Sequence, residues 1–471
     1  MLMKKSVLIT LAAALFLTSG CKKGGAESES GNSVVSSLSI ESSDFSDLAE
    51  PDSETESVRG QTESEPVATP SRNASSQAVS SKSASSIAST SIPQEGVENM
   101  DFVLNQAKEL GLDEALLEKA VVNKGNQAAI ANAMKKAQRG ESVTVGVIGG
   151  SITQGSKATV ASKSYASLLK AWWQDQFPGS TLKFINAGVG ATDSLIGVHR
   201  MGTDLLRHNP DFIVVEFAVN DVSDSLHKET CESLVRRILK QGNKPGVLLL
   251  FLINQNGESA QTNQQAIGAN YDLPMISYKT AIWPEIGKKF KWADIAADNV
   301  HPNNTGHAII GVMLKYYLAK LKQGLASAPS AVNALANPIT KSGYENAVLL
   351  TNANFSAQSL GGFTVTNGAY YQFPNGWTVK NNTAPIVFEV TDASNLYILY
   401  HATTSGNGGK VLVSLDGGTA RTLNSDASDS FERAETYKVL SGSQTGTHRL
   451  EIKLQPAGTK DEFTILGILK S

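Results

Sequence analysis

The chain has 471 residues, of which 18% are charged, and its 41 basic and 44 acidic residues give a formal charge of −3. At roughly 150 residues per domain, this length corresponds to about three domains. The near-neutral charge and the pI of about 6.2 exclude a nucleic-acid-binding protein that needs a broad basic face. Two cysteines are too few for a disulfide-stapled scaffold or for a cysteine-rich zinc or iron–sulfur site.

Residues 1–20 have the pattern of an export signal. Lys4 and Lys5 precede an apolar run over residues 7–17, which is shorter than the about 20 residues that a membrane-spanning helix needs. Small residues then stand directly before Cys21, an arrangement that resembles the lipobox of bacterial lipoproteins. The resemblance implies that Cys21 is lipidated and holds the exported protein on a lipid bilayer of the cell envelope. Cleavage without lipidation would instead give a secreted protein.

Residues 21–95 are predicted to form a serine-rich, disordered tether. Between residues 26 and 93, 22 of 68 residues are serine, and aromatic or periodic apolar residues are almost absent. Such a segment cannot bury enough apolar surface to offset the entropy lost on ordering. This stretch has a formal charge of −8, whereas the chain from Gln94 onward has +1. We expect a surface stalk in preference to a partner-binding tail, and a body whose charge does not attract nucleic acid.

Residues 96–325 are predicted to form an α/β domain. Helical periodicity comes first, over residues 100–110, 113–121 and 126–139. Apolar runs bounded by turn residues then alternate with helical stretches, over residues 143–148, 182–187, 212–218, 247–253 and 273–277. Continuous apolar runs are typical of parallel strands with both faces buried. The alternation predicts a three-layer, doubly wound parallel sheet of the flavodoxin-like kind, with its ligand crevice at the carboxyl ends of the strands.

Polar residues and a glycine stand where these strands end. Ser151 follows the first strand on a turn that two glycines permit, Gly188 ends the second, and Asn220 follows the third. Asp298 and His301 come beyond the fifth strand, in the sequence Asp-Asn-Val-His-Pro. Since the carboxyl ends of parallel strands meet at one edge of the sheet, we expect these five residues to lie together.

Acyl transfer gives each of these residues a role. A serine needs a base at neutral pH, and His301 qualifies because imidazole titrates near pH 6.5. Asp298 could accept from the other ring nitrogen and fix the tautomer. The backbone N–H groups of Ser151 and Gly188 and the side-chain amide of Asn220 could stabilise the oxyanion, and losing one such donor costs about 2.7–4 kcal/mol of barrier. No cofactor or metal ion is needed, and the seven histidines have no paired ligand spacing.

The four motifs, in this order, resemble the SGNH hydrolases, a branch of the GDSL lipases and esterases. The resemblance covers about residues 142–321 and implies the SGNH fold. It implies these functional residues: nucleophile Ser151, oxyanion-hole residues Gly188 and Asn220, base His301 and orienting acid Asp298. The family usually has aspartate directly before the nucleophile, where this chain has Gly150, so a hydrogen bond that supports the turn is expected to be missing. The Gly-Gly-Ser-Ile-Thr sequence is also similar to branches of exported carbohydrate esterases.

These residues also have structural interpretations. A Gly-Ser turn can be only a turn, Asn220 could cap a helix, and a histidine before proline can simply precede a helix. His307 is expected to pack rather than to serve as a second base. His199 and Arg200 lie beyond the second strand and could reach the cleft, but we favour structural roles for both.

After a short linker beyond Leu325, residues 340–471 are predicted to form an all-β sandwich. Strands with period two are expected over residues 386–390, 396–401, 410–415, 448–454 and 463–469. Their order resembles the jelly-roll modules attached to several SGNH carbohydrate esterases. Four aromatic residues could stack on sugar rings or fill the core, and we favour the core: Tyr370, Tyr371, Phe373 and Trp377.

The sequence therefore predicts an exported serine esterase that removes acyl groups, with acetyl favoured, from a carbohydrate through a Ser-His-Asp triad and an acyl-enzyme. The preference for acetyl rests on the resemblance and on the appended sandwich. Two alternatives stay open. One is an acyltransferase that uses the same triad on cell-wall glycan, and the other is a glycan-binding lipoprotein with an inactive hydrolase fold.

Overall fold

The computed structural model describes residues 95–471, apart from residues 428–430, 443, 456–457 and 459–460. The predicted signal peptide, Cys21 and almost all of the tether lie outside the described residues. Within the described part of the chain, no helix is both long and apolar enough to cross a membrane.

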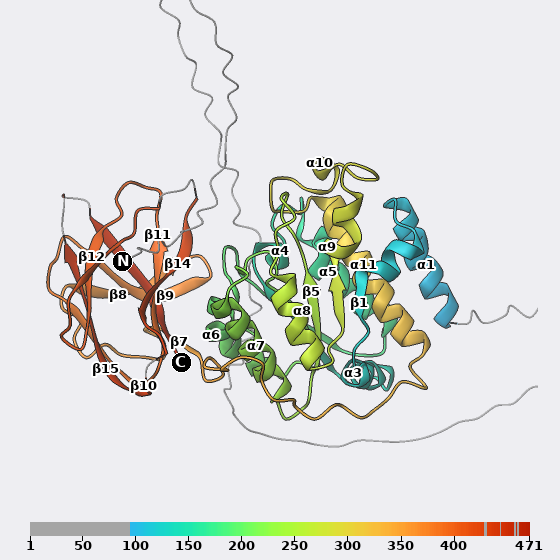
Figure 1. Ribbon diagram of the computed structural model, residues 1–471, viewed down its shortest axis with the longest axis horizontal. Helices are drawn as coiled ribbons and strands as arrows, with labels where there is room; N and C mark the ends of the chain where they lie inside the picture. Colours follow the sequence, from blue (N-terminus) through green and yellow to red (C-terminus); the bar gives the residue numbers. More distant parts are fainter. Residues whose placement is uncertain (1–94, 428–430, 443, 456–457, 459–460) are drawn as a thin grey trace, which may run out of the picture. The chain divides into compact units, whose positions relative to one another are not determined.

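The first half of the described chain is an α/β domain (Figure 1). Its helices and strands are, in chain order, α1 (Glu95–Glu109), α2 (Glu114–Ala120), β1 (Val121–Asn123), α3 (Ala128–Gln138), β2 (Val143–Gly149), α4 (Ser151–Gln154), α5 (Tyr165–Gln176), β3 (Leu182–Gly188), α6 (Ser194–Asp204), β4 (Phe212–Glu216), α7 (Ser225–Leu239), β5 (Gly246–Phe251), α8 (Gln261–Asn270), β6 (Met275–Ser277), α9 (Tyr278–Ile282), α10 (Trp292–Ile295) and α11 (Asn304–Gln323).

These strands form one six-stranded sheet in the order β1-β6-β5-β4-β2-β3. The five strands expected from the sequence are all present and parallel, so the predicted doubly wound fold is confirmed. The sheet also contains β1, which pairs antiparallel with β6 at its edge. The sequence prediction placed Val121 at the end of a helix, because a strand of three residues is too short to show a period of two.

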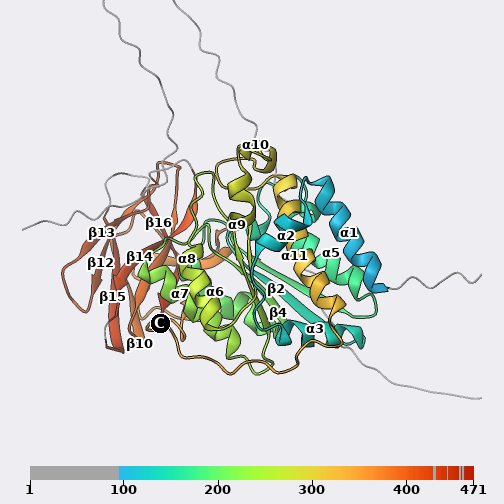
Figure 2. The same cartoon turned by 45° about the vertical axis from the view of Figure 1, so that its right-hand side comes forward.

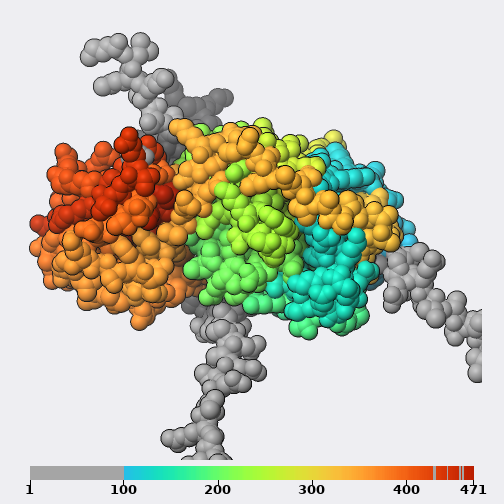
Figure 3. All heavy atoms as spheres, turned by 90° about the horizontal axis from the view of Figure 1, so that it is seen from below, coloured from blue at the N-terminus to red at the C-terminus, as the bar shows by residue number. Residues whose placement is uncertain are grey.

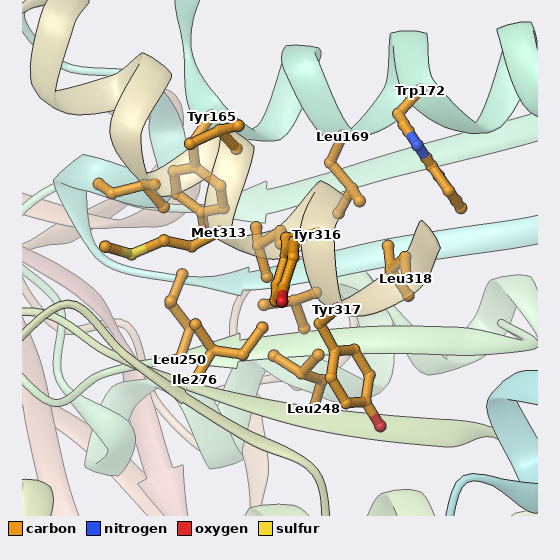
Figure 4. Close-up of a cluster of buried hydrophobic side chains, with 14 of the residues drawn as sticks. Tyr165, Leu169, Trp172, Leu248, Leu250, Ile276, Met313, Tyr316, Tyr317 and Leu318 are labelled. Carbon is orange, nitrogen blue, oxygen red and sulfur yellow. The ribbon is translucent and has the colours of Figure 1, made fainter. Parts of the chain in front are cut away.

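Side chains of each central strand alternate between two apolar layers. Phe212 and Val214 of β4 face the layer that contains α1, α5 and α11, whereas Ile213 and Val215 face the layer that contains α6 and α7. The turned view shows these helices on opposite sides of β2 and β4 (Figure 2). Figure 4 shows Tyr316 of α11 among the side chains that fill the first layer. Both faces of the sheet are therefore covered, which explains the continuous apolar runs.

The second half of the described chain is an antiparallel β-sandwich. Its strands are β7 (Val348–Leu350), β8 (Phe363–Tyr370), β9 (Phe373–Lys380), β10 (Ile386–Ala393), β11 (Leu396–Ala402), β12 (Lys410–Leu415), β13 (Arg421–Asn424), β14 (Arg433–Leu440), β15 (Gly446–Gln455) and β16 (Glu462–Lys470). One sheet has the order β10-β15-β12-β13, and the other has the order β14-β11-β16-β9-β8, with β7 paired to β16. The predicted strands correspond to β10, β11, β12, β15 and β16. The sequence reasoning missed the other strands, which are short or rich in polar residues and therefore show a weak period.

The segment between the domains is bound to α7 rather than free. Glu232 of α7 accepts hydrogen bonds from the backbone N–H groups of Ile339 (2.8 Å) and Thr340 (2.7 Å). Arg236 forms an ion pair with Glu345. Figure 3 shows the orange segment lying along the surface of the α/β domain. The predicted linker is therefore held against α7 by residues 339–345, and we call this segment the strap.

The two domains also share an apolar cluster. Leu195 and Val198 of α6 belong to the same buried cluster as Tyr344, Phe373 and Leu399 from the strap and the sandwich. The Tyr344 hydroxyl lies 2.9 Å from the Tyr397 hydroxyl of β11. A shared core of this kind holds the sandwich beside the carboxyl ends of β2 and β3.

Candidate active site

The predicted nucleophile and base are in hydrogen-bond contact. Ser151 is the first residue of α4, directly after β2, and its Oγ lies 2.8 Å from Nε2 of His301. His301 lies on the loop between α10 and α11, and its Nδ1 is 2.9 Å from Oδ2 of Asp298. Because Nδ1 faces a carboxylate, it is the protonated ring nitrogen, which leaves Nε2 free to accept the proton of Ser151.

The loop holds Asp298 as a carboxylate. Burial raises the pKa of Asp298, but hydrogen bonds from the backbone N–H groups of His301 and Val300 and from the His301 ring outweigh burial, so the net pKa is lowered. The distances from these N–H groups to Oδ1 are 2.8 and 2.9 Å. Trp292 Nε1 donates to the carbonyl oxygen of Asp298 at 2.8 Å. The carboxylate is thus oriented toward His301 before any substrate binds.

Gly150 leaves room for the side chain of Asn220. A Cβ atom at position 150 would lie 2.3 Å from Oδ1 of Asn220. Among the described residues, this Oδ1 has no hydrogen-bond partner. A residue with a side chain at position 150 would therefore require the side chain of Asn220 to move from its present position.

The backbone N–H of Gly188 is engaged in a hydrogen bond within the same strand. This N–H donates to Oδ1 of Asn186 at 2.9 Å, and a Cβ at Gly188 would lie 2.2 Å from the backbone nitrogen of Gln154. The glycine thus lets β3 approach α4. Gly190 lies nearer to the nucleophile, because a Cβ there would be 3.9 Å from Cβ of Ser151. The motif could not reveal the hydrogen bond to Asn186, and the role of Gly188 in an oxyanion hole stays a prediction.

His199 and Arg200 are buried beneath the site and do not line the cleft. Arg200 is 1% exposed and donates to the carbonyl oxygens of Ala187 (2.7 Å) and Gly149 (3.0 Å). It therefore ties together the ends of β2 and β3. Burial lowers the pKa of His199 to about 4, and its ring packs against Tyr344. The structural roles favoured from the sequence agree with these positions.

His307 is also a packing residue, as expected. Its Nδ1 accepts from the backbone N–H of Tyr165 at 3.3 Å, and its Nε2 lies 3.1 Å from the carbonyl oxygen of Ser156. Burial lowers the pKa of His307. The ring therefore anchors the segment after α4 to α11.

Sequence reasoning missed a buried polar group behind the nucleophile. Glu216 is the last residue of β4 and is fully buried. Its Oε2 accepts from Oγ1 of Thr153 at 2.8 Å, and Oγ1 of Thr153 lies 2.7 Å from the hydroxyl of Tyr165. A glutamate at the end of the apolar run Phe-Ile-Val-Val-Glu was the signal that could have identified it.

One aromatic residue of the sandwich reaches the nucleophile's helix. Tyr371, in the turn between β8 and β9, is 69% exposed, and its hydroxyl accepts from Nε2 of Gln154 at 3.3 Å. Phe373 and Trp377 are buried, as favoured from the sequence, and Tyr370 is half-buried and stacks on His401 with ring centroids 4.4 Å apart. Tyr371 alone of the four departs from the core assignment.

No group of three or more His, Cys, Asp or Glu side chains suited to a metal ion occurs in the portion of the chain that the structure covers.

Known proteins are similar to the α/β domain of this chain. Residues 147–309 match the model of the GDSL-like Lipase/Acylhydrolase family. The chain is similar to thioesterase 1/protease 1/lysophospholipase L1 of Escherichia coli (strain K12), with 24% identity over 175 residues, which cover 36% of this chain and 79% of that protein.

A solved structure is similar over both domains. A two-domain esterase (CEX) active on acetylated mannans has 29% identity and a TM-score of 0.72, with 75% of this chain and 98% of that chain covered. The same esterase co-crystallized with mannopentaose has a TM-score of 0.71 and 29% identity, with 75% and 97% covered. The family match spans the turn of Ser151, the strand ends and the loop of His301, so residues 147–309 of this chain form a GDSL-like lipase/acylhydrolase domain, as the SGNH resemblance predicted.

Proposed function

We propose that this protein is a serine esterase that removes acetyl groups from a carbohydrate. The observation that carries the proposal is the contact of Ser151 Oγ with His301 Nε2 at 2.8 Å, with Asp298 on the opposite ring nitrogen at 2.9 Å. A nucleophile, a base and an orienting acid in this order are what acyl transfer from an ester requires. The carbohydrate is inferred from the similarity of both domains to an esterase active on acetylated mannans.

In the first half of the reaction, Ser151 Oγ attacks the acetyl carbonyl carbon while His301 Nε2 takes its proton. Asp298 stabilises the resulting imidazolium. The backbone N–H of Ser151 and the side-chain amide of Asn220 donate to the oxyanion. The carbon–oxygen bond to the sugar then breaks, and the sugar oxygen takes the proton from His301, which leaves acetyl on Ser151.

In the second half, His301 removes a proton from water, and the water oxygen attacks the acetyl-enzyme. The intermediate collapses, acetate leaves, and Ser151 regains its proton from His301. An acceptor sugar hydroxyl in place of water would give the acyltransferase alternative with the same residues.

The position of Tyr371 supports the proposal that the substrate is a carbohydrate. Its φ of +29° is unusual for a residue with a side chain, and such strain persists where the surroundings enforce it. The hydrogen bond to Gln154 places an exposed aromatic ring beside the helix that begins with Ser151. An aromatic ring in that position can stack on the sugar that carries the ester.

We expect Tyr371→Ala to raise KM for acetylated mannan by about fivefold, because one stacking contact is worth on the order of 1 kcal/mol. The kcat/KM for p-nitrophenyl acetate, which has no sugar, should stay within about twofold of wild type. Tyr437→Ala, a change of the same kind in β14, is the control. An equal loss on both substrates would contradict a role in sugar binding.

The central experiment measures acetate release from a panel of acetylated mannans and xylans by the wild type and by Ser151→Ala. We expect release by the wild type and a loss of at least about 10³-fold in the variant. No release from any ester, with no effect of Ser151→Ala, would overturn the esterase proposal. Acetyl transfer to an added glycan in excess of hydrolysis would favour the acyltransferase, and glycan binding without turnover would favour the inactive lipoprotein.

We also propose, from the sequence alone, that Cys21 anchors the protein in a membrane of the cell envelope. Metabolic labelling with a palmitate analogue should label the wild type and leave Cys21→Ser unlabelled. Labelling of neither protein, with both found in the culture medium, would support the secreted form instead.

A further inference from the structure

The turn that carries Ser151 rests on a buried carboxyl group from the neighbouring strand. Glu216 ends β4 and lies opposite Gly149 of β2 in the parallel register. Its Oε2 accepts from Oγ1 of Thr153 at 2.8 Å. Thr153 is fully buried and lies in the same short helix as the nucleophile, two residues after it. The carboxyl group is therefore one side chain away from the helix that positions Ser151.

Thr153 is held from three directions. Besides the contact with Glu216, its Oγ1 lies 2.7 Å from the hydroxyl of Tyr165 of α5. Its carbonyl oxygen accepts from Nδ2 of Asn186 of β3 at 3.0 Å. A β-strand on either side and a helix above it thus fix one residue of the nucleophile's turn, which is far more than a solvent-exposed turn requires.

The turn cannot provide this support from its own residues. A Cβ at Gly149 would lie 2.2 Å from Oγ1 of Thr153, and a Cβ at Gly150 would lie 2.3 Å from Oδ1 of Asn220. Both positions must therefore be glycine if Thr153 and Asn220 are to keep their places. Any carboxyl group that supports the turn has to come from another strand.

We propose that Glu216 is a positioning residue of the esterase, whose carboxyl group holds Thr153 and thereby the turn of Ser151, in place of the aspartate that related enzymes usually have before the nucleophile. The inference rests on the proposed function, because it concerns the same serine. Glu216 touches no reacting atom and acts through Thr153, with a further contribution from the backbone N–H of Gly150.

Stability alone does not account for a glutamate in this place. Among the described residues, Oε1 of Glu216 has no hydrogen bond of good geometry, and a buried polar atom without a partner is unfavourable for folding. An aliphatic residue would continue the apolar run of β4 without that cost. A polar group retained at such a position beside a nucleophile indicates a role in the reaction.

The pKa of Glu216 reflects its burial and its partners. Burial raises its pKa to about 8, the charge of Asp221 acts in the same direction, and hydrogen bonds from Thr153 and from the backbone N–H of Gly150 oppose the rise. Burial and the charge of Glu216 raise the pKa of the Tyr165 hydroxyl, which contacts the other side of Thr153 Oγ1.

The test removes each half of the contact and then restores it. Thr153→Val and Glu216→Ala remove the hydroxyl and the carboxyl group, whereas Thr153→Ser and Glu216→Gln keep a donor and an acceptor in place. The control is Glu232→Gln, since Glu232 is an equally buried glutamate that accepts from the hydroxyl of Tyr271 at 2.7 Å and lies away from the cleft.

The measurements are kcat and KM for p-nitrophenyl acetate, the midpoint of thermal unfolding, and the rate at which a fluorophosphonate labels Ser151. We expect Thr153→Val and Glu216→Ala to lower kcat and the labelling rate by about 10- to 100-fold with KM within about twofold, because displacement of a nucleophile by about 1 Å costs that much. The Ser and Gln variants should stay within about threefold of wild type. The double variant should be no slower than the slower single variant, since both changes break one contact. Glu232→Gln should lower only the midpoint.

The inference is overturned if folded Thr153→Val keeps the wild-type kcat and labelling rate, or if Glu216→Gln loses as much activity as Glu216→Ala. If Glu216→Ala does not fold, the Thr153 pair decides the matter. A wild-type protein that hydrolyses no ester contradicts the proposed function, and the labelling rates of the same variants then still test the positioning of Ser151.

Discussion

Single Cβ atoms decide the geometry around Ser151. Gly150 leaves room for Asn220, and Gly188 leaves room for the backbone of α4. From sequence, the first was interpreted as a lost hydrogen bond and the second as an oxyanion donor. In the structure, the Asn220 side chain lies close to the backbone of Gly150, and the backbone of α4 lies close to that of Gly188, where only glycine has no Cβ in the way.

We expect Gly150→Ala to lower kcat by about 10²-fold with little change in the free energy of unfolding. The new Cβ would lie 2.3 Å from Oδ1 of Asn220, whose side chain can rotate away but then no longer faces the oxyanion. Steady-state kinetics with p-nitrophenyl acetate measure the change in kcat, and chemical denaturation measures the free energy of unfolding.

The matched control for Gly150→Ala is Gly179→Ala, because a Cβ at Gly179 meets no atom within 4 Å. This variant should keep the wild-type kcat. A Gly150→Ala enzyme as fast as the wild type would show that Asn220 does not need its present position.

At the scale of elements, His227 joins the first turns of two helices. Asp193 is the N-cap of α6 and Asp224 is the N-cap of α7. Nε2 of His227 lies 3.2 Å from Asp193, and Nδ1 lies 2.8 Å from Asp224. Burial alone would lower the pKa of His227, but the hydrogen bond to Asp193 and the charges of Asp193 and Asp221, with Asp224, raise it to about 10.

This raised pKa gives a pH dependence of known sign. A histidine that binds its proton more tightly in the folded state stabilises the fold below its unfolded pKa near 6.5, and the contribution disappears as the pH rises through about 10. We expect His227→Gln to lower the free energy of unfolding at about pH 6 by on the order of 2 kcal/mol. The effect is smaller than the pKa shift alone implies, because Asp193 and Asp224 are partly exposed and solvent weakens both ion pairs.

Urea denaturation of the wild type and of His227→Gln at several pH values measures this difference. It should shrink steadily between about pH 6.5 and pH 10. A difference that stays constant or grows with pH would mean that the histidine is not bound as an imidazolium. The control is His448→Gln, because His448 pairs with Asp416 in the sandwich and lies away from α6 and α7.

At the scale of the whole described molecule, the sandwich and the α/β domain depend on each other. The strap is held by Glu232 and Arg236 of α7, and Tyr344 inserts between His199 and Tyr397. Because the apolar cluster of α6 continues into the sandwich, removing the sandwich would expose it. The two domains should therefore unfold together.

We expect Tyr344→Ala to destabilise the protein by about 3–5 kcal/mol, because it removes a large buried ring from the shared cluster. Calorimetry should show one transition for the wild type and two for the variant. Tyr344→Phe, which removes only the hydroxyl, should cost about 1 kcal/mol and keep one transition. Two transitions in the wild type would contradict the dependence of the domains on each other.

Much of the fold and part of the site follow from local pattern. Continuous apolar runs identified β2 to β6, because a strand buried on both faces has to be apolar throughout. Ser151 was found because it directly follows a strand, where a parallel sheet brings strand ends to one edge. Asp298 and His301 were found from the sequence Asp-Asn-Val-His-Pro, which comes later, on the loop between α10 and α11. The short edge strand β1 and the polar strands β8 and β9 were missed, since a weak period leaves no local signal.

The sequence by itself determined the order of the elements, the doubly wound sheet and the choice of a serine, a histidine and an aspartate for the site. Only the tertiary structure decided which glycines serve close packing, that Asn186 takes the Gly188 N–H, that Glu216 lies under Thr153, and that Tyr371 reaches Gln154. The reason is physical. Periodicity records which face of an element is buried, whereas contacts between residues far apart in the chain depend on the distances that packing sets.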